Sequence, residues 1–189
     1  MNATSEVRLP ATLNDLFLLA MMLAMAAILT TAMMFQYRGG EIPCPLCLLQ
    51  RVAMFGVCFG IMLHFRDGAS ARHDALSMLF ALFLLIVSAR QTLLDIYPRA
   101  GHGYVGTAIF GIYMPVWSVI VSVAILLAYT IKIAVLGGEN VRDDEKPELM
   151  SSAQSLLSYY MIALCAINFI SVIVQCGMQA CHTTGYKLL

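Results

Sequence analysis

Two cysteines separated by two residues stand where a polar segment meets a long apolar one. Cys44 and Cys47 flank Pro45 and Leu46, and a turn-rich stretch, residues 38–43, precedes them. We predict that Cys44 caps a helix and that Pro45 is its first residue, because proline fits the first helical position without losing a hydrogen bond. Cys47 then lies in the first turn, near unpaired backbone N–H groups and the positive end of the helix dipole.

Arg51 follows Cys47 by one helical turn and is expected on the same helix face. Its positive charge and the helix dipole both favour the thiolate form of Cys47. A thiolate is the attacking species in thiol–disulfide exchange. The motif therefore predicts redox chemistry, with a structural zinc corner or an incidental cysteine pair as the alternatives.

A second close cysteine pair, Cys176 and Cys181, follows the last apolar segment of the chain. Two close pairs at predicted helix ends indicate redox or metal chemistry on one membrane face, although a purely structural disulfide also fits the second pair. The other two cysteines, Cys58 and Cys165, lie inside apolar segments and are expected to be inert packing residues. A zinc site built from both pairs has the right ligand count. We predict no metal site, because a membrane-facing cysteine pair beside an arginine is a poor place to gather four thiolates and a cation.

The composition identifies a membrane protein. Of the 189 residues, 60% are hydrophobic and only 12% are charged, and the mean hydropathy is +0.81. These values exclude a soluble globular domain. The formal net charge is zero and no basic patch interleaved with aromatic residues is present, so a nucleic acid is not expected as a partner.

Five apolar segments are each long enough to cross a bilayer as a helix. They are residues 16–36, 46–64, 75–97, 112–136 and 155–175. We therefore predict an all-α integral membrane protein in which residues 1–189 form a single membrane domain, with a four-helix transmembrane bundle and a fifth, C-terminal transmembrane helix. A cleaved signal peptide is a poorer interpretation of the first segment, because the apolar run is too long and no small-residue cleavage site precedes Arg38. Residues 104–110 are expected to form a short interfacial helix.

The basic residues near the span ends favour a cytoplasmic N-terminus by six to five. The inner set is Arg8, Arg66, Arg72, Lys132, Arg142 and Lys146, and the outer set is Arg38, Arg51, Arg90, Arg99 and Lys187. The difference increases when Arg51 and Arg90 are set aside, since both lie inside predicted spans. The first pair opens the second span and the second pair follows the fifth. The four spans between them, an even number, place both pairs on the same side of the membrane, whichever side that is.

The Cys-Pro-Leu-Cys motif with Arg51, opening the second of several spans, resembles the disulfide bond formation protein B (DsbB) family. Members of that family are membrane oxidases that pass electrons from a periplasmic thiol oxidase to quinone. Two weaker stretches, residues 91–98 and 111–117, resemble the family's segments at the end of the third span and the start of the fourth. The resemblance covers about four spans, residues 10–137.

The resemblance implies a quinone-dependent, protein-disulfide-generating oxidoreductase of the bacterial inner membrane, with a cytoplasmic N-terminus and both cysteine pairs in the periplasm. Its partner would be a DsbA-like thioredoxin-fold thiol oxidase, and its cofactor would be ubiquinone or menaquinone from the membrane pool. The implied catalytic residues are Cys44, Cys47, Cys176 and Cys181, and the implied quinone-binding residues are Arg51, Gln91 and Cys47. Electrons are expected to run from the C-terminal pair to the Cys44/Cys47 pair, because the dipole and Arg51 stabilise the reduced form of the latter.

The sequence departs from the best-known members of the family in two places. The loop over residues 99–110 has no cysteine, and the second pair instead follows a fifth span, as in a five-span branch of the family. Gln91 stands where better-known members carry a histidine near the quinone, and it can hydrogen-bond a quinone carbonyl. The alternatives are a vitamin K epoxide reductase-like or reductively acting quinone/thiol oxidoreductase, and a non-enzymatic membrane metal-binding or scaffold protein. Quinone-dependent turnover would distinguish the enzymes from the scaffold.

Overall fold

The computed structural model of the chain describes residues 3–40, 42–96, 108–136 and 147–177. The described residues form five helices: α1 (Ala3–Arg38), α2 (Pro45–Asp67), α3 (Ala71–Ile96), α4 (Met114–Leu136) and α5 (Glu148–Cys176). Each helix contains a segment that is long and apolar enough to cross a membrane. The predicted all-α membrane architecture is confirmed.

The helices extend beyond several of the predicted spans. The first helix begins at Ala3 rather than at residue 16, and the fifth begins at Glu148 rather than at residue 155. The predicted bounds followed the apolar core of each segment, whereas a helix continues through polar residues until its backbone is interrupted. Pro147 precedes the first residue of α5, and Glu148 in the first turn is favourable beside the positive end of the helix dipole.

A tight turn, rather than a helix, leads into α4. The backbones of Ile109 and Ile112 exchange two hydrogen bonds of 3.0 Å each. Between them, Phe110 has φ 53° and Gly111 has φ 77°, the two positive φ angles that a type I′ turn requires. The predicted helix over residues 104–110 is therefore wrong over its described part, and residues 104–107 lie outside the described residues.

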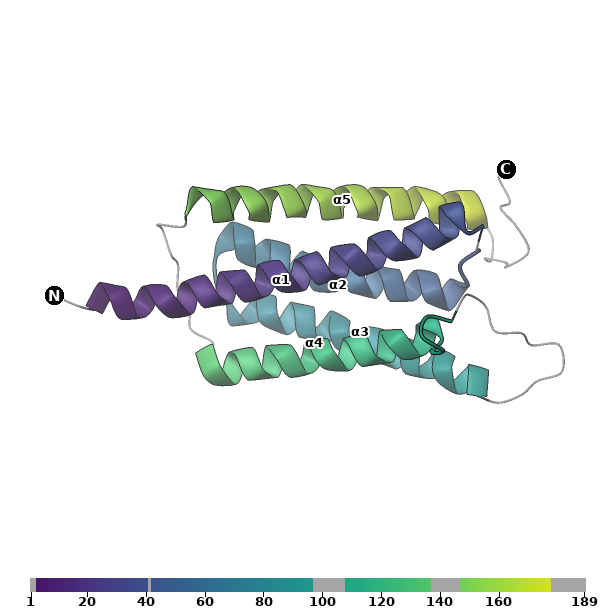
Figure 1. Ribbon diagram of the computed structural model, residues 1–189, viewed down its shortest axis with the longest axis horizontal. Helices are drawn as coiled ribbons and strands as arrows, with labels where there is room; N and C mark the ends of the chain where they lie inside the picture. The colour runs from purple at the N-terminus through teal and green to yellow at the C-terminus, as the bar shows by residue number, and fades with distance from the viewer. Residues whose placement is uncertain (1–2, 41, 97–107, 137–146, 178–189) are drawn as a thin grey trace.

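The five helices lie side by side along one long axis (Figure 1). In the bundle α3 packs between α2 and α4, while α5 packs against α1 and α2. The end of α1, the beginning of α2 and the end of α5 lie at the same end of the bundle, on the right in Figure 1. This end carries the Cys-Pro-Leu-Cys motif.

Two glycines one turn apart allow α3 to approach α2 closely. A Cβ atom added to Gly56 would clash with the ring of Phe80, and one added to Gly60 would clash with the side chain of Ser77 and lie 2.9 Å from the carbonyl oxygen of His73. Ser77 fills the space beside α2 and donates a 3.1 Å hydrogen bond to the carbonyl oxygen of Val57. Small residues spaced by four are a common means of close helix packing in membranes.

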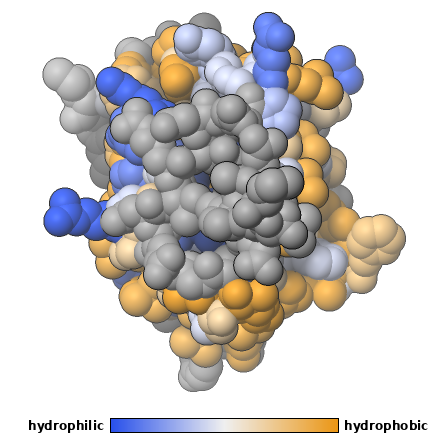
Figure 2. Space-filling model, turned by 90° about the vertical axis from the view of Figure 1, so that its left-hand side faces the viewer, coloured by the Kyte–Doolittle hydropathy of each residue, from blue (hydrophilic) through white to orange (hydrophobic). Residues whose placement is uncertain are grey.

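The interior and the periphery of the bundle are both largely apolar, as expected when the solvent is lipid. Residues that are almost completely buried come from all five helices and include Leu18, Met22, Leu29, Val57, Ile61, Leu84, Tyr129 and Met161. Large apolar side chains also face outward, among them Leu79, Ile86, Ile131 and Phe169. Figure 2 views the bundle end on, from the side where α1 begins, and shows hydrophobic side chains over much of the described circumference.

A buried ion pair joins α3 and α4 at the end of the bundle opposite the motif. Lys132 Nζ lies 2.6 and 2.7 Å from the two carboxylate oxygens of Asp74, and both side chains are buried. Lys132, which lies within the predicted span 112–136, is therefore paired inside the bundle and does not belong in a count of loop charges. With Lys132, Arg51 and Arg90 all set aside, the sequence count is five to three.

Candidate redox site

The Cys-Pro-Leu-Cys motif opens α2 in the way that its local sequence predicts. Cys44 has extended backbone angles, φ −68° and ψ 158°, and its sulfur accepts a 3.1 Å hydrogen bond from the backbone N–H of Cys47. Pro45 is the first helical residue. The two cysteines form a disulfide with their Cα atoms 5.1 Å apart, so the first turn of α2 closes a small covalent ring.

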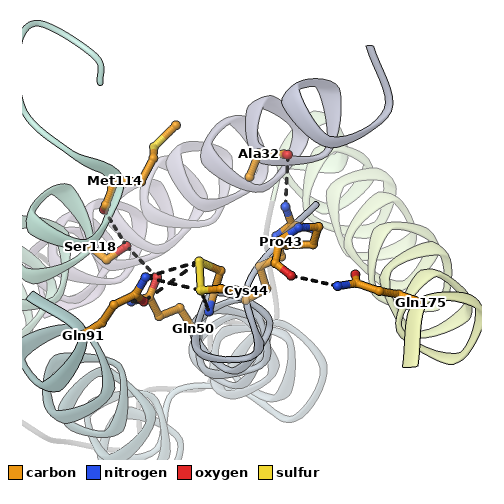
Figure 3. The surroundings of a disulfide bond; sticks show 10 residues. Ala32, Pro43, Cys44, Gln50, Gln91, Met114, Ser118 and Gln175 are labelled. Atoms are coloured by element: carbon orange, nitrogen blue, oxygen red, sulfur yellow. Dashed lines mark hydrogen bonds between the residues drawn. A yellow bond between two sulfur atoms is a disulfide. The ribbon is translucent and has the colours of Figure 1, made fainter. Parts of the chain in front are cut away.

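A row of polar side chains leads to one side of this disulfide. The Gln91 Nε2 atom, on α3, lies 3.3 Å from the sulfur of Cys44 and 3.4 Å from that of Cys47. Gln50, one turn into α2, donates a 2.9 Å hydrogen bond from Nε2 to Oε1 of Gln91. Ser118, on α4, lies 3.3 Å from Oε1 of Gln50. Figure 3 shows these three side chains beside the disulfide, with Gln91 facing its sulfurs.

Arg51 points toward α1 and α5 from the same turn of α2. Its Nη1 donates to Oε1 of Gln36 at 2.5 Å and lies 3.4 Å from Oδ1 of Asn168. Its Nη2 donates a 3.1 Å hydrogen bond to the carbonyl oxygen of Ala32. The guanidinium is buried, and these contacts hold it in one orientation.

An apolar cavity lies between α1, α2 and α4 and reaches the disulfide. Its volume is about 510 Å³, and Cys47, Gln50 and Arg51 form part of its wall. The remaining wall is mainly apolar and includes Ile28, Phe35, Met54, Phe110, Trp117 and Val121. A cavity of this size with a few convergent polar groups has the character of a small-molecule site. Gln91 and Cys44 do not line it.

The last turn of α5 lies against the segment that leads into the motif. The side-chain amide of Gln175 donates a 2.8 Å hydrogen bond to the carbonyl oxygen of Pro43. Cys176, the next residue, is buried and takes part in a disulfide. Cys181 lies outside the described residues, so its pairing with Cys176 stays a prediction.

The structure thus brings Cys44, Cys47, Arg51 and Gln91 together and places Cys176 at the same end of the bundle. Cys58 is a free, buried thiol in the middle of α2, and Cys165 is a free thiol on the outer face of α5. Five polar residues of this end were not predicted from the sequence: Gln36, Gln50, Ser118, Asn168 and Gln175. The sequence could have indicated them, because a polar side chain inside an apolar span usually faces a hydrogen-bonding partner or a functional site.

The fold and the site define a class: a multi-pass α-helical membrane protein with a cysteine pair at a helix N-terminus beside an apolar cavity. Residues 14–102 match the family model described as disulfide bond formation protein DsbB. The chain is also 38% identical over 96 residues to disulfide bond formation protein B of Azoarcus sp. (strain BH72). No solved structure matches the chain at a significant level.

These matches confirm the resemblance that the motifs indicated, over a shorter length. The family match includes the CPLC motif, Arg51 and Gln91 but ends before α4, so the 111–117 stretch lies outside it. The alignment to the Azoarcus protein covers 49% of this chain and 57% of that protein. The chain is therefore similar to the DsbB family in α1, α2 and α3.

Proposed function

We propose that this protein is a membrane thiol oxidase that reoxidises a thioredoxin-fold dithiol partner and passes the electrons to a quinone. The observation that carries the proposal is that Cys47, one half of the Cys44–Cys47 disulfide, forms part of the wall of the apolar cavity. The disulfide and a cavity suited to a lipid-soluble electron acceptor therefore share one residue, Cys47. The DsbB-family match over residues 14–102 supports the same function.

The residues around the cavity fit a quinone. Its apolar wall, formed by side chains such as Phe35, Met54 and Val121, suits the ring and the first part of an isoprenoid tail. Gln50 and Arg51 supply hydrogen-bond donors in the same wall, and a quinone carbonyl needs a donor of this kind. A bound quinone would supply a two-electron acceptor.

The chain's own residues account for the thiol steps. We assign the entry of electrons to Cys176 and Cys181, which exchange with the partner dithiol and then reduce the Cys44–Cys47 disulfide. The helix N-terminus stabilises the reduced form of the latter pair, whereas Cys176 ends a helix, where the dipole disfavours a thiolate. Arg51 supplies a fixed positive charge in the cavity wall, which favours negative charge on a ligand there.

We propose the orientation that this function requires, with the N-terminus in the cytoplasm and both cysteine pairs at the periplasmic face of the bacterial inner membrane. The hydrogen bond between Gln175 and Pro43 supports a shared face, because it places the end of α5 beside the beginning of α2. The partner would be a soluble periplasmic protein with a thioredoxin-type dithiol.

Alkylation trapping of thiols in native membranes tests the function. With quinone present, both pairs should be oxidised, and quinone depletion should cause Cys44 and Cys47 to accumulate in the reduced form. In a Cys176→Ser/Cys181→Ser variant, the partner dithiol should no longer be reoxidised while quinone still oxidises the first pair. Thiols that stay free, or stay oxidised regardless of quinone, would refute electron transfer and favour a metal-binding or structural role.

A further inference from the structure

A row of three polar side chains, each from a different helix, ends at the disulfide. It runs from Ser118 on α4 to Gln50 on α2 and then to Gln91 on α3, whose amide nitrogen faces both sulfurs (Figure 3). All three side chains are more than nine-tenths buried, with exposed fractions of 8%, 6% and 6%. Polar groups buried this deeply are costly unless each of them is paired.

The hydrogen bonds in this row all run in one direction. A disulfide sulfur has no hydrogen, so it can only accept, and the group that faces it must be the NH₂ of Gln91. Oε1 of Gln91 is farther from the disulfide, 4.0 Å from the sulfur of Cys47, and accepts a 2.9 Å hydrogen bond from Nε2 of Gln50. The amide of Gln50 has its own orientation fixed in turn, because its Oε1 faces the hydroxyl of Ser118.

Turning either amide around would break the row. A reversed Gln91 would set its oxygen against the sulfurs and its NH₂ against the NH₂ of Gln50. A reversed Gln50 would place its oxygen against Oε1 of Gln91. The Ser118 hydroxyl is also 3.2 Å from the carbonyl oxygen of Met114, so its single hydrogen is shared between two acceptors. The anchoring by Ser118 is therefore weaker than that of Gln91 by Gln50.

We propose that Gln91 is a catalytic residue that stabilises the thiolate released when the Cys44–Cys47 bond opens, and that Gln50 and Ser118 are positioning residues that keep its NH₂ on the sulfurs. This inference rests on the proposed function and adds to it a role for Gln91 that differs from the sequence-based expectation. The sequence suggested a hydrogen bond from Gln91 to a quinone carbonyl. The structure places its donors on the sulfurs instead, and Gln91 is not part of the cavity wall.

The exchange step shows why two donors are useful. An incoming thiolate bonds to the sulfur of Cys44, the Cys44–Cys47 bond breaks, and its electron pair stays on Cys47 as a thiolate. The second thiol of the incoming pair then attacks the mixed disulfide, and its proton passes to Cys44, which leaves as a thiol. In the closed disulfide the Nε2 atom of Gln91 lies 3.4 Å from the sulfur of Cys47 and 3.3 Å from that of Cys44, so its NH₂ is already in place when negative charge develops on Cys47. Hydrogen bonds to an anionic acceptor are stronger than those to a neutral one.

The test is the thiolate character of the reduced pair, measured without quinone. A background variant in which the other four cysteines are replaced (Cys58→Ala, Cys165→Ala, Cys176→Ser and Cys181→Ser) leaves only Cys44 and Cys47. In that background, Gln91→Met keeps the length of the side chain and removes both donors. Iodoacetamide alkylation of each cysteine is followed by peptide mass spectrometry across a range of pH, and the reduction potential is measured in a glutathione buffer.

We expect Gln91→Met to slow alkylation of Cys47 at neutral pH by about tenfold, because the thiolate loses the hydrogen-bond donor that stabilises it. Its disulfide should become correspondingly harder to reduce. Gln50→Met should produce a smaller change in the same direction, and Ser118→Ala the smallest. The matched control is Gln154→Met, which removes a buried glutamine from the first half of α5 and should leave the alkylation profile unchanged.

An unchanged alkylation profile and potential in Gln91→Met would overturn the proposal, even if that variant is less stable to heat. An equal shift in Gln154→Met would overturn it as well. The proposed function fails by a different observation, namely quinone-independent oxidation of the wild-type pair. The two failures are therefore distinguishable.

Discussion

The side-chain amide of Gln175 donates a 2.8 Å hydrogen bond to the carbonyl oxygen of Pro43, the residue immediately before Cys44. Gln175 is also the residue immediately before Cys176, and its side chain is completely buried. This hydrogen bond therefore connects the backbone carbonyl just before Cys44 with the side chain of the residue just before Cys176. It fixes the last turn of α5 against the beginning of α2.

We expect Gln175→Leu to slow electron transfer from the Cys176/Cys181 pair to the Cys44–Cys47 disulfide by about fivefold, the factor equivalent to the roughly 1 kcal/mol of one hydrogen bond. After addition of a reduced dithiol partner, acid quench and alkylation would show the C-terminal pair accumulating in the reduced form. Gln154→Leu, at the other end of the same helix, is the matched control. Equal transfer rates in the two variants would show that the Gln175–Pro43 contact does not position the two pairs.

Arg51 provides a second test, in which charge and geometry are separated. Arg51→Lys retains a positive charge but cannot reproduce the fork that bonds both Gln36 and the carbonyl oxygen of Ala32. We expect Arg51→Ala to lower the potential of the Cys44–Cys47 pair and to raise the KM for a short-chain quinone about tenfold, because the cavity wall loses its cation. Arg51→Lys should largely restore the potential and only partly restore the KM. An Arg51→Ala variant with unchanged potential and unchanged KM would contradict the role of the charge.

The cavity can be filled without touching the disulfide. Val121 on α4 lines the cavity, whereas Val123, two residues later, is 40% exposed on the outer face. We expect Val121→Phe to raise the KM for quinone about tenfold, because the added ring occupies volume that a ligand needs. Val123→Phe should have no effect on KM, and both variants should retain the wild-type potential of the cysteine pair. A similar KM in the two phenylalanine variants would place the quinone elsewhere.

The close contact between α2 and α3 depends on the absence of a side chain at Gly60. We expect Gly60→Val to lower the free energy of unfolding by about 1–3 kcal/mol, because the new side chain must displace Ser77 and the backbone at His73. Thermal unfolding of the detergent-solubilised protein measures this change. Phe59→Val, on the outward face of the same turn, is the control, and a comparable loss in that variant would mean that the close approach at Gly60 is not what matters.

The parts of the site that depend on neighbouring residues could be predicted from the sequence. The cap at Cys44 and the helix start at Pro45 follow from local backbone chemistry, and the structure confirms both. The five helices were also predictable, because apolar length alone identifies a membrane span. The ends of the helices were harder to predict, because polar turns continue α1 and α5 beyond their apolar segments.

The parts that depend on the register between helices could not be predicted. Gln50, Gln91 and Ser118 are separated by at least 27 residues in sequence from one helix to the next, and nothing local specifies that they meet at one disulfide. Each is visible in the sequence only as a polar residue within an apolar span. The type I′ turn at Phe110 was missed for another reason, since its first central residue is a phenylalanine, which seldom adopts a positive φ.

Lys132 was counted among the inner charges although it lies within the predicted span 112–136, and the structure pairs it with Asp74 inside the bundle. A buried ion pair is strongly destabilised when only one partner is removed, because the other charge is left uncompensated. We therefore expect Lys132→Met to lower the free energy of unfolding by about 3–5 kcal/mol. The double variant Asp74→Leu/Lys132→Met should recover most of that loss, since two apolar side chains replace the pair. Thermal unfolding of both variants measures the difference, and a double variant no more stable than Lys132→Met would show that Asp74 has a role at this end of the bundle beyond balancing the lysine.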